Sequence, residues 1–143
     1  MGDGITRYKI DPIPQKQKPT TYEMGTLTNR LKSFKSIKST YRELSEYISK
    51  GHAILLADFK EDNNIDKSNI YCLSCIALDI DSKVKPIARV VLIEKIYNKF
   101  GVLPIISYNT FSDTNNTKFR LIYRLDNAID LETYETLYKA LQW

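Results

Sequence analysis

The alternation in the segment 118-KFRLIYRL-125 constrains the fold more than any other feature of the chain. Because side chains along a β-strand point to opposite faces in turn, this pattern predicts a strand with one face buried in a core. The second face carries three cations. The apolar set comprises Phe119, Leu121, Tyr123 and Leu125, and the other set comprises Lys118, Arg120, Ile122 and Arg124.

Three further segments have the composition of strands, at 52–59 (HAILLADF), 70–80 (IYCLSCIALDI) and 103–110 (LPIISYNT). Residues 112–117 (SDTNNT) are rich in turn-forming side chains, so we expect the strands 103–110 and 118–125 to form a hairpin. Apolar spacing and end signals predict helices at 26–38, 40–50, 86–100 and 131–142, with Thr40 and Asp130 as N-caps and Gly51 and Gly101 as stops.

The order of these elements predicts one small domain of the α/β class, more closely α+β. A mixed or antiparallel sheet is flanked by helices, and 143 residues suffice for one core. We divide the chain into a basic, proline-containing arm over residues 1–20, with a short edge strand near residues 5–10, and a domain over 21–143. No apolar run approaches the roughly 18 residues of a membrane helix, and no signal-peptide pattern is present. We therefore expect a cytoplasmic protein that does not contact a membrane.

The two cysteines, Cys72 and Cys75, raise the question of a zinc site. Both lie on the strand 70–80, where positions 72 and 75 face opposite sides of the sheet. A second pair of cysteines is absent from the sequence and His52 is the sole histidine. The spacing therefore favours two core thiols over a zinc site held by this pair.

Positive charge is concentrated in the first third of the chain. Residues 1–50 carry ten Lys or Arg against five Asp or Glu, whereas residues 51–143 carry eleven against twelve. A basic face of this kind suits a phosphate-rich or acidic partner, with a plain solvated face as the alternative. The residues that we expect on the basic surface are Arg30, Lys32, Lys35 and Lys38, beside Lys9, Lys16 and Lys18.

Asp79 and Asp81 end the apolar strand 70–80 and project from one face of it, because residues i and i+2 of a strand share a face. Two adjacent carboxylates repel each other unless a cation neutralises them. Oxygen ligands of this kind suit magnesium or manganese. The alternative is an ordinary strand end that dissolves into a turn.

The hairpin adds charges of both signs to this end of the sheet. Its turn contributes a third carboxylate, Asp113, and its return strand contributes Lys118, Arg120 and Arg124. Carboxylates beside a row of cations can hold a metal together with a phosphate. Cross-strand ion pairs on a solvated sheet face are the competing interpretation, worth about 0–1 kcal/mol per pair. Zinc, held by the three carboxylates with His52 as a fourth ligand, is a further alternative.

The order of 78-LDID-81, 110-TFSD-113 and 118-KFRLIYRL-125 resembles the archaeo-eukaryotic primase, or primase-polymerase, superfamily, most closely its phage and plasmid forms. The resemblance covers about residues 40–142. It implies that Asp79 and Asp81 bind a divalent metal and that Lys118 and Arg120 contact nucleotide or template. It also implies a fold similar to the N-terminal part of that family's catalytic core.

The chain departs from the family at two points. Asp113 stands where the family has a histidine that contacts the incoming nucleotide's phosphates, and it brings negative charge to that place. The family also uses another carboxylate from a later strand, whereas Asp126 and Asp130, which follow the hairpin here, are expected in a loop and a helix cap. We therefore expect a protein that acts by binding rather than by catalysis.

These expectations define three classes of function. The first is a phage or mobile-element protein, in the host cytoplasm, that inhibits a host nucleic-acid-targeting complex in the manner of an anti-CRISPR or other anti-defence protein. The second is a primase or nucleotidyltransferase, or its catalytic fragment, with Asp79 and Asp81 as catalytic residues. The third is a nucleic-acid-binding module, in which aromatic side chains near the cations, such as Tyr108 and Tyr123, stack on bases.

Overall fold

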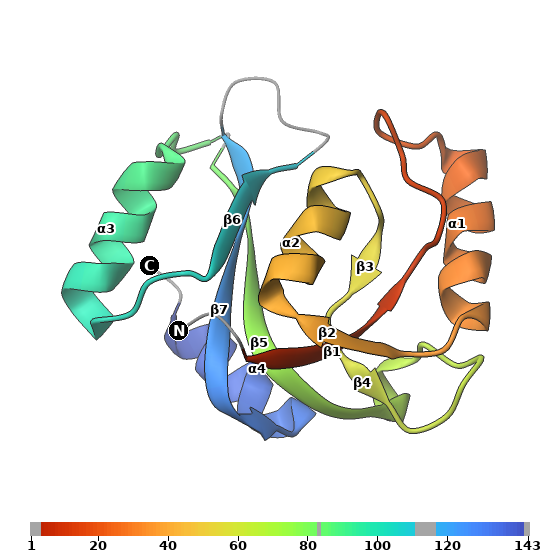
Figure 1. Ribbon diagram of the computed structural model, residues 1–143. Helices are drawn as coiled ribbons and strands as arrows, with labels where there is room; N and C mark the ends of the chain where they lie inside the picture. The colour runs from red at the N-terminus through yellow and green to blue at the C-terminus, as the bar shows by residue number, and fades with distance from the viewer. Residues whose placement is uncertain (1–3, 83, 111–116, 142–143) are drawn as a thin grey trace.

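The computed structural model describes residues 4–82, 84–110 and 117–141, which form four α-helices and two antiparallel sheets (Figure 1). The predicted α+β class is confirmed. The helices are α1 (Thr21–Ser33), α2 (Tyr41–Ser49), α3 (Arg89–Phe100) and α4 (Leu131–Ala140). The strands are β1 (Ile5–Ile10), β2 (Ile37–Thr40), β3 (Ile54–Leu55), β4 (Asp58–Phe59), β5 (Ile70–Asp81), β6 (Ile106–Asn109) and β7 (Lys118–Ile129), and a 3-10 turn, η1 (Lys67–Asn69), precedes β5.

The larger sheet has the strand order β4-β5-β7-β6 and is built around two strands of 12 residues each, β5 and β7. Both strands confirm the sequence prediction, and β6 pairs antiparallel with β7 as the expected hairpin requires. The strand β6 is shorter than the expected 103–110 segment and begins only after Pro104, which lacks the backbone N–H that a ladder needs.

The alternation along β7 separates two hydrophobic clusters on opposite faces of this sheet. Phe119, Leu121 and Tyr123 pack in one cluster, where α3 contributes buried side chains such as Leu92. Ile122 points to the opposite cluster, between the sheet and the elements β1 and α2. Figure 1 shows these layers, with α3 and α4 on one side of β5 and β7, and α2 and the smaller sheet on the other.

The smaller sheet has the order β2-β1-β3, which places β1 in the middle. The prediction of an edge strand near residues 5–10 is therefore wrong, and residues 5–11 belong to the folded body rather than to an arm. Tyr8 is fully buried and its hydroxyl lies 2.6 Å from the Ser39 hydroxyl of β2. Lys9 and Asp11 are also fully buried, although their charges favoured a surface position.

The predicted strand at 52–59 divides into two short strands that belong to different sheets. The strand β3 pairs with β1, whereas β4 pairs with β5. Between them the Ala57 N–H donates to the Leu55 carbonyl at 2.9 Å, a tight turn that redirects the chain. A continuous apolar run therefore crosses from one sheet to the other.

The predicted N-caps of α2 and α4 are confirmed, whereas the predicted start of α1 is wrong. Thr40 accepts a hydrogen bond from the Glu43 N–H at the start of α2, and the Asp130 carboxylate accepts one from the Thr133 N–H at the start of α4, so both predicted caps are confirmed. Gly101 ends α3 in the left-handed conformation, with φ of 71°. The helix expected at 26–38 instead begins at Thr21.

A capping box explains this shift of α1. Thr20 and Glu23 each accept a hydrogen bond from the other's backbone N–H, which starts the helix five residues earlier than its apolar spacing indicated. Residues 37–40, at the end of the predicted helix, form β2 instead.

Candidate functional site

Asp79 and Asp81 lie at the end of β5, next to the first residues of β7. The antiparallel register sets Asp79 opposite Arg120 and Asp81 opposite Lys118. Because opposite residues of neighbouring strands project from the same face, two carboxylates and two cations form a ladder of alternating charge across the two strands. The strand pairing therefore sets the two carboxylates beside Lys118 and Arg120 as cross-strand ion pairs, while the expected convergence of Asp79 and Asp81 with Asp113 falls outside the described residues.

Both pairs of the ladder are in contact, and one is much closer than the other. The Arg120 Nε donates to Asp79 Oδ1 at 2.5 Å, whereas the Lys118 Nζ lies 4.0 Å from Asp81 Oδ2. The carboxylates are open to solvent, with side-chain exposed fractions of 66% for Asp79 and 60% for Asp81. The cations are half as exposed, at 29% for Arg120 and 30% for Lys118. The acidic side of the ladder is therefore the more accessible one.

Tyr108 of β6 fixes the other end of the Arg120 guanidinium. The Arg120 Nη1 donates to the Tyr108 hydroxyl at 3.0 Å, and the guanidinium carbon lies 5.9 Å from the ring centroid. Burial disfavours the charged form of Arg120, but the hydrogen bond to Asp79 and the proximity of Tyr108 outweigh it, so its pKa is raised. The guanidinium is thus a fixed charge held between a carboxylate and a phenol.

Two cavities meet at Arg120. The first, here called the ladder cavity, has a volume of about 320 Å³ and is lined by Asp79, Asp81, Thr110, Lys118 and Arg120, with Ile80 and Phe119. The second, here called the inner cavity, has a volume of about 300 Å³ and lies among β6, β7, α1 and the turn after α2. Its lining is Gln15, Pro19, Met24, Leu27, Ile48, Gly51, His52, Ala53, Ile54, Tyr108, Asn109, Thr110 and Arg120.

His52 belongs to the inner cavity and is absent from the lining of the ladder cavity. Its Nδ1 lies 2.8 Å from the Asp11 carbonyl oxygen, and its ring contacts Tyr47 edge-on. Since a carbonyl oxygen only accepts, Nδ1 carries the proton, and Nε2 is the ring nitrogen that can contact a ligand. The structure thus gives His52 a place apart from Asp79 and Asp81, against the alternative that the three share a zinc ion.

The remaining predicted site residues lie elsewhere. Asp113 falls outside the described residues. Arg124 shares the face of Arg120 but lies four residues further along β7, roughly 13 Å away, beside Gly4 and opposite Cys75. Arg124 therefore lies outside the ladder, and its predicted role in binding a phosphate or a partner stays a prediction.

Two residues that we expected on the basic surface form hydrogen bonds inside the fold. Arg30 donates from Nε and Nη2 to the two carboxylate oxygens of buried Asp11, at 2.7 and 2.8 Å. The Arg30 side chain is still 24% exposed, but its charge is neutralised by Asp11. Lys9 is buried and donates to the Lys32 carbonyl oxygen at 3.1 Å, so the assignment of Lys9 to the basic surface is wrong.

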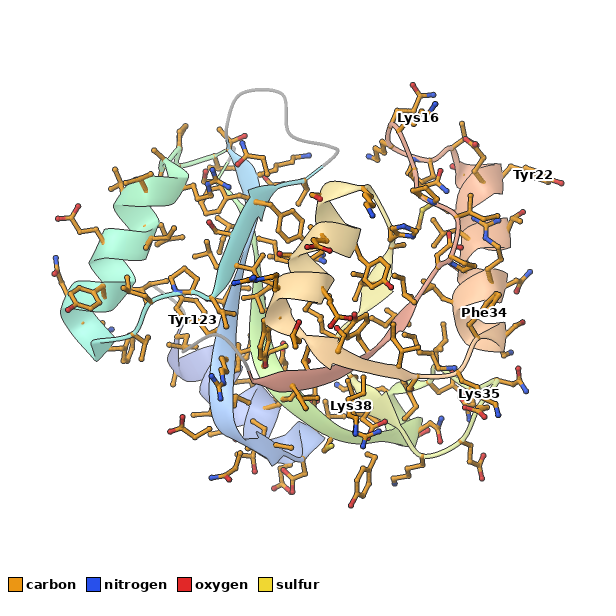
Figure 2. The ribbon with its side chains drawn as sticks, viewed as in Figure 1. Lys16, Tyr22, Phe34, Lys35, Lys38 and Tyr123 are labelled. Atoms are coloured by element: carbon orange, nitrogen blue, oxygen red, sulfur yellow. The ribbon has the colours of Figure 1, made fainter. Side chains whose placement is uncertain are left out.

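The other expected basic residues are at the surface. Lys32, Lys35 and Lys38 are exposed. Figure 2 shows Lys35 and Lys38 near the end of α1 and along β2, with Lys16 at the opposite end of α1. The exposed Lys32, Lys35 and Lys38 are here called the basic strip, which lies on another part of the molecule from the ladder cavity.

Among the described residues, neither cysteine belongs to a group of three or more His, Cys, Asp or Glu side chains. Cys75 is buried and burial raises the pKa of its thiol to about 12. Cys72 is half-buried, with its sulfur 4.0 Å from Asp58 Oδ2. In the part of the chain that the structure describes, no three His, Cys, Asp or Glu side chains are grouped closely enough to hold a metal among themselves. The described residues alone therefore do not complete the coordination of a metal at Asp79 and Asp81.

Sequence reasoning did not find the inner cavity. Its walls come from segments far apart in the sequence, and the apolar residues among them read as ordinary core positions. Tyr108 was noted as an aromatic residue near the cations, and its place opposite Arg120 follows from the register of the hairpin. Tyr123, the other aromatic considered for base stacking, is in the hydrophobic cluster beneath α3.

Comparison with known protein families, with curated proteins and with solved structures finds no match for this chain. Among the described helices, none combines the length and apolar composition needed to cross a membrane.

Proposed function

We propose that this chain binds a divalent cation together with a phosphate-bearing partner at the ladder cavity, and that it acts by binding rather than by turning over a substrate. The observation that carries the proposal is the register of β5 and β7, which sets two open carboxylates against two cations. The residues present fit a hard divalent cation, because Asp79 and Asp81 offer oxygen ligands and are accessible to solvent.

The charges of the ladder can be exchanged for those of a ligand. At present each carboxylate faces a cation of β7, so the four charges sum to zero. A magnesium or manganese ion takes the place of the cations beside Asp79 and Asp81, while a phosphate takes the place of the carboxylates beside Lys118 and Arg120. Two carboxylates alone make a weak magnesium site, and phosphate oxygens complete the coordination shell. Metal and phosphate therefore strengthen each other's binding.

The phosphate-bearing partner that we propose is nucleic acid or a nucleoprotein complex. Exposed Lys32, Lys35 and Lys38 offer further contacts to a phosphate backbone on another part of the surface. Inhibition of a host nucleic-acid-targeting complex is the biological role that this mode of binding would serve. It is supported by the resemblance to phage and plasmid primases and by the basic strip.

Nucleotidyl transfer is the second candidate. The observation that favours it is the placement of Asp79 and Asp81 on one strand face beside Arg120, since metal-bound carboxylates next to a phosphate-binding cation are parts of a phosphoryl-transfer site. Two-metal transfer needs more acidic ligands than this pair, so the binding function is the one that the described residues support better.

Manganese binding tests the proposal. We would titrate the protein with Mn²⁺, with and without a short single-stranded DNA, and compare it with Asp79→Asn/Asp81→Asn. The matched control is Asp126→Asn, an exposed carboxylate further along β7. We expect DNA to tighten Mn²⁺ binding to the protein and to the control, and the double variant to lose at least tenfold in affinity. Equal affinity in all three proteins would contradict the proposal.

A primer-extension assay separates the two candidates. With Mn²⁺ or Mg²⁺, template and nucleotides, the binding function predicts no incorporation. Incorporation that Asp79→Asn abolishes and Asp126→Asn preserves would establish the enzymatic alternative and end the binding-only proposal.

A further inference from the structure

We infer that the inner cavity binds the body of a small organic phosphate whose phosphate group draws Arg120 away from Asp79, and that occupancy of this cavity thereby strengthens divalent-cation binding at the ladder cavity. The inference rests on the proposed function, because it assumes that Asp79 and Asp81 bind a cation. It adds a second ligand site, a class of ligand for that site and a coupling between the two.

Arg120 is placed to connect the two cavities. It lines both of them, and its guanidinium has Nε on Asp79 and Nη1 on Tyr108. A guanidinium has five N–H donors in a planar fork, a geometry that matches a phosphate in two-point contact. The Tyr108 side of the fork borders the inner cavity, so an anion there reaches the same group that neutralises Asp79.

The inner cavity is suited to an organic molecule rather than to a bare ion. Its volume of about 300 Å³ is at the lower end of the range of small-molecule sites. Its walls are mainly apolar, with polar groups at a few points. The apolar side chains are Met24, Leu27, Ile48, Ile54 and the ring of Tyr108, and the polar ones are Gln15, His52, Asn109, Thr110 and Arg120.

The backbone holds this cavity open in a defined shape. The Gln15 N–H donates to the Gly51 carbonyl, and the Asp11 N–H donates to the Ala53 carbonyl, both at 2.9 Å. These bonds tie the segment between β1 and α1 to the turn after α2. The same segment holds His52 through its Nδ1–H, which directs the ring and leaves Nε2 as a second polar contact for a ligand.

The coupling follows from competition for Arg120. In the unliganded protein the guanidinium hydrogen bond must be broken before Asp79 can offer both its oxygens to a metal. A phosphate in the inner cavity removes that cost, because it supplies the guanidinium with a new partner. By thermodynamic linkage, metal at Asp79 and Asp81 strengthens binding of the organic phosphate by the same factor.

Phenyl phosphate and inorganic phosphate are the probes that separate this coupling from a simple charge effect. Both carry the anion, and only phenyl phosphate has an apolar body for the inner cavity. We expect saturating phenyl phosphate to tighten Mn²⁺ binding by about fivefold or more, within the usual range of coupling between sites. Inorganic phosphate should tighten it less, because it makes only the contacts with the charged groups.

Met24→Trp is the variant that tests the location, because Met24 lines the inner cavity from the first turn of α1, is 44% exposed, and a larger ring there fills the space. We expect this variant to lose the advantage of phenyl phosphate over inorganic phosphate and to keep Mn²⁺ binding. The matched control is Tyr22→Trp on the same helix, since Tyr22 is 85% exposed and points away from the body in Figure 2.

The outcomes separate this inference from the proposed function. If Mn²⁺ binds to the wild-type protein but phenyl phosphate has no more effect than inorganic phosphate, the inference is overturned and the proposed function stands. The same holds if Met24→Trp behaves as wild type. If Mn²⁺ does not bind under any condition, the proposed function fails. Calorimetry of phenyl phosphate without metal then decides whether the cavity assignment survives: binding that Met24→Trp removes supports it, and no binding overturns it.

Discussion

Replacement of Arg30 by methionine should destabilise this protein far more than the loss of an ordinary surface cation. Asp11 is fully buried, and both of its carboxylate oxygens accept hydrogen bonds from Arg30, at 2.7 and 2.8 Å. The variant leaves that carboxylate buried, with the Ile13 N–H as its remaining hydrogen-bond donor among the described residues. Arg30 itself is partly exposed, so the cost lies with Asp11: a buried polar group left without its hydrogen-bond partner costs about 1–3 kcal/mol, and a charged group costs more. This is a substantial part of the roughly 5–15 kcal/mol by which a native domain is stable.

The loss should depend on pH in a defined direction. Burial raises the pKa of Asp11, but the hydrogen bonds from Arg30 and from the Ile13 N–H outweigh it, so the folded-state pKa lies below its ordinary value. A carboxylate with a lowered folded pKa contributes stability above its unfolded pKa, about 3.9, and that contribution is lost as the pH falls through the folded pKa. The difference between the wild type and Arg30→Met should therefore be largest near pH 7 and should shrink in acid.

Urea unfolding followed by circular dichroism, at pH 7 and at steps down to pH 3, measures both effects. The control is Lys35→Met, an exposed cation near the end of the same helix, which should change the free energy of unfolding by no more than about 0.5 kcal/mol. If Arg30→Met costs as little as Lys35→Met, or if its cost is the same at every pH, the assignment of Arg30 to a buried ion pair is refuted.

Three further changes have defined outcomes. Gly51→Ala should destabilise the protein by about 1–3 kcal/mol in thermal unfolding, because Gly51 has φ of 92° and an added Cβ would lie 2.0 Å from the Gln15 carbonyl oxygen. The control Gly25→Ala, with open space around it on α1, should stabilise the protein by about 0.5–1 kcal/mol. The Cys75 thiol should resist iodoacetamide at pH 7.5 in the folded protein and react on unfolding, since burial raises its pKa to about 12, and rapid native-state labelling would refute this. Tyr123→Phe should leave stability unchanged or raise it, because the buried hydroxyl has no hydrogen-bond partner among the described residues, and a loss above about 1 kcal/mol would show a missing partner.

The parts of the fold that could be predicted are those whose signals are local. The alternation of Phe119 and Leu121 with charged residues specifies a half-buried strand, and Thr40 with Glu43 specifies a helix start. Neither signal depends on residues elsewhere in the chain. The hairpin of β6 and β7 is local in the same sense, whereas the pairing of β5 with β7 sets Asp79 against Arg120, 41 residues away, and no local signal specifies it.

The parts that could not be predicted depend on partners distant in the sequence. The central position of β1 follows from its pairing with both β2 and β3, and no feature of residues 5–10 specifies which strands flank them. Lys9 is expected at the surface because charged residues are rarely buried without partners, yet both Lys9 and Asp11 are fully buried. Their partners are Arg30, which lies 19 residues away in α1, and the Lys32 carbonyl oxygen.

Paramagnetic broadening by Mn²⁺ in an NMR spectrum of the protein, with a short single-stranded DNA present, tests the central claim most directly. The account predicts that substoichiometric Mn²⁺ broadens the amide signals of residues 79–81 and 118–120 first, while that of Asp126, at the other end of β7, stays sharp. Broadening that begins elsewhere, or that is uniform along β7, would show that the ladder of Asp79, Asp81, Lys118 and Arg120 is only a pair of surface salt bridges.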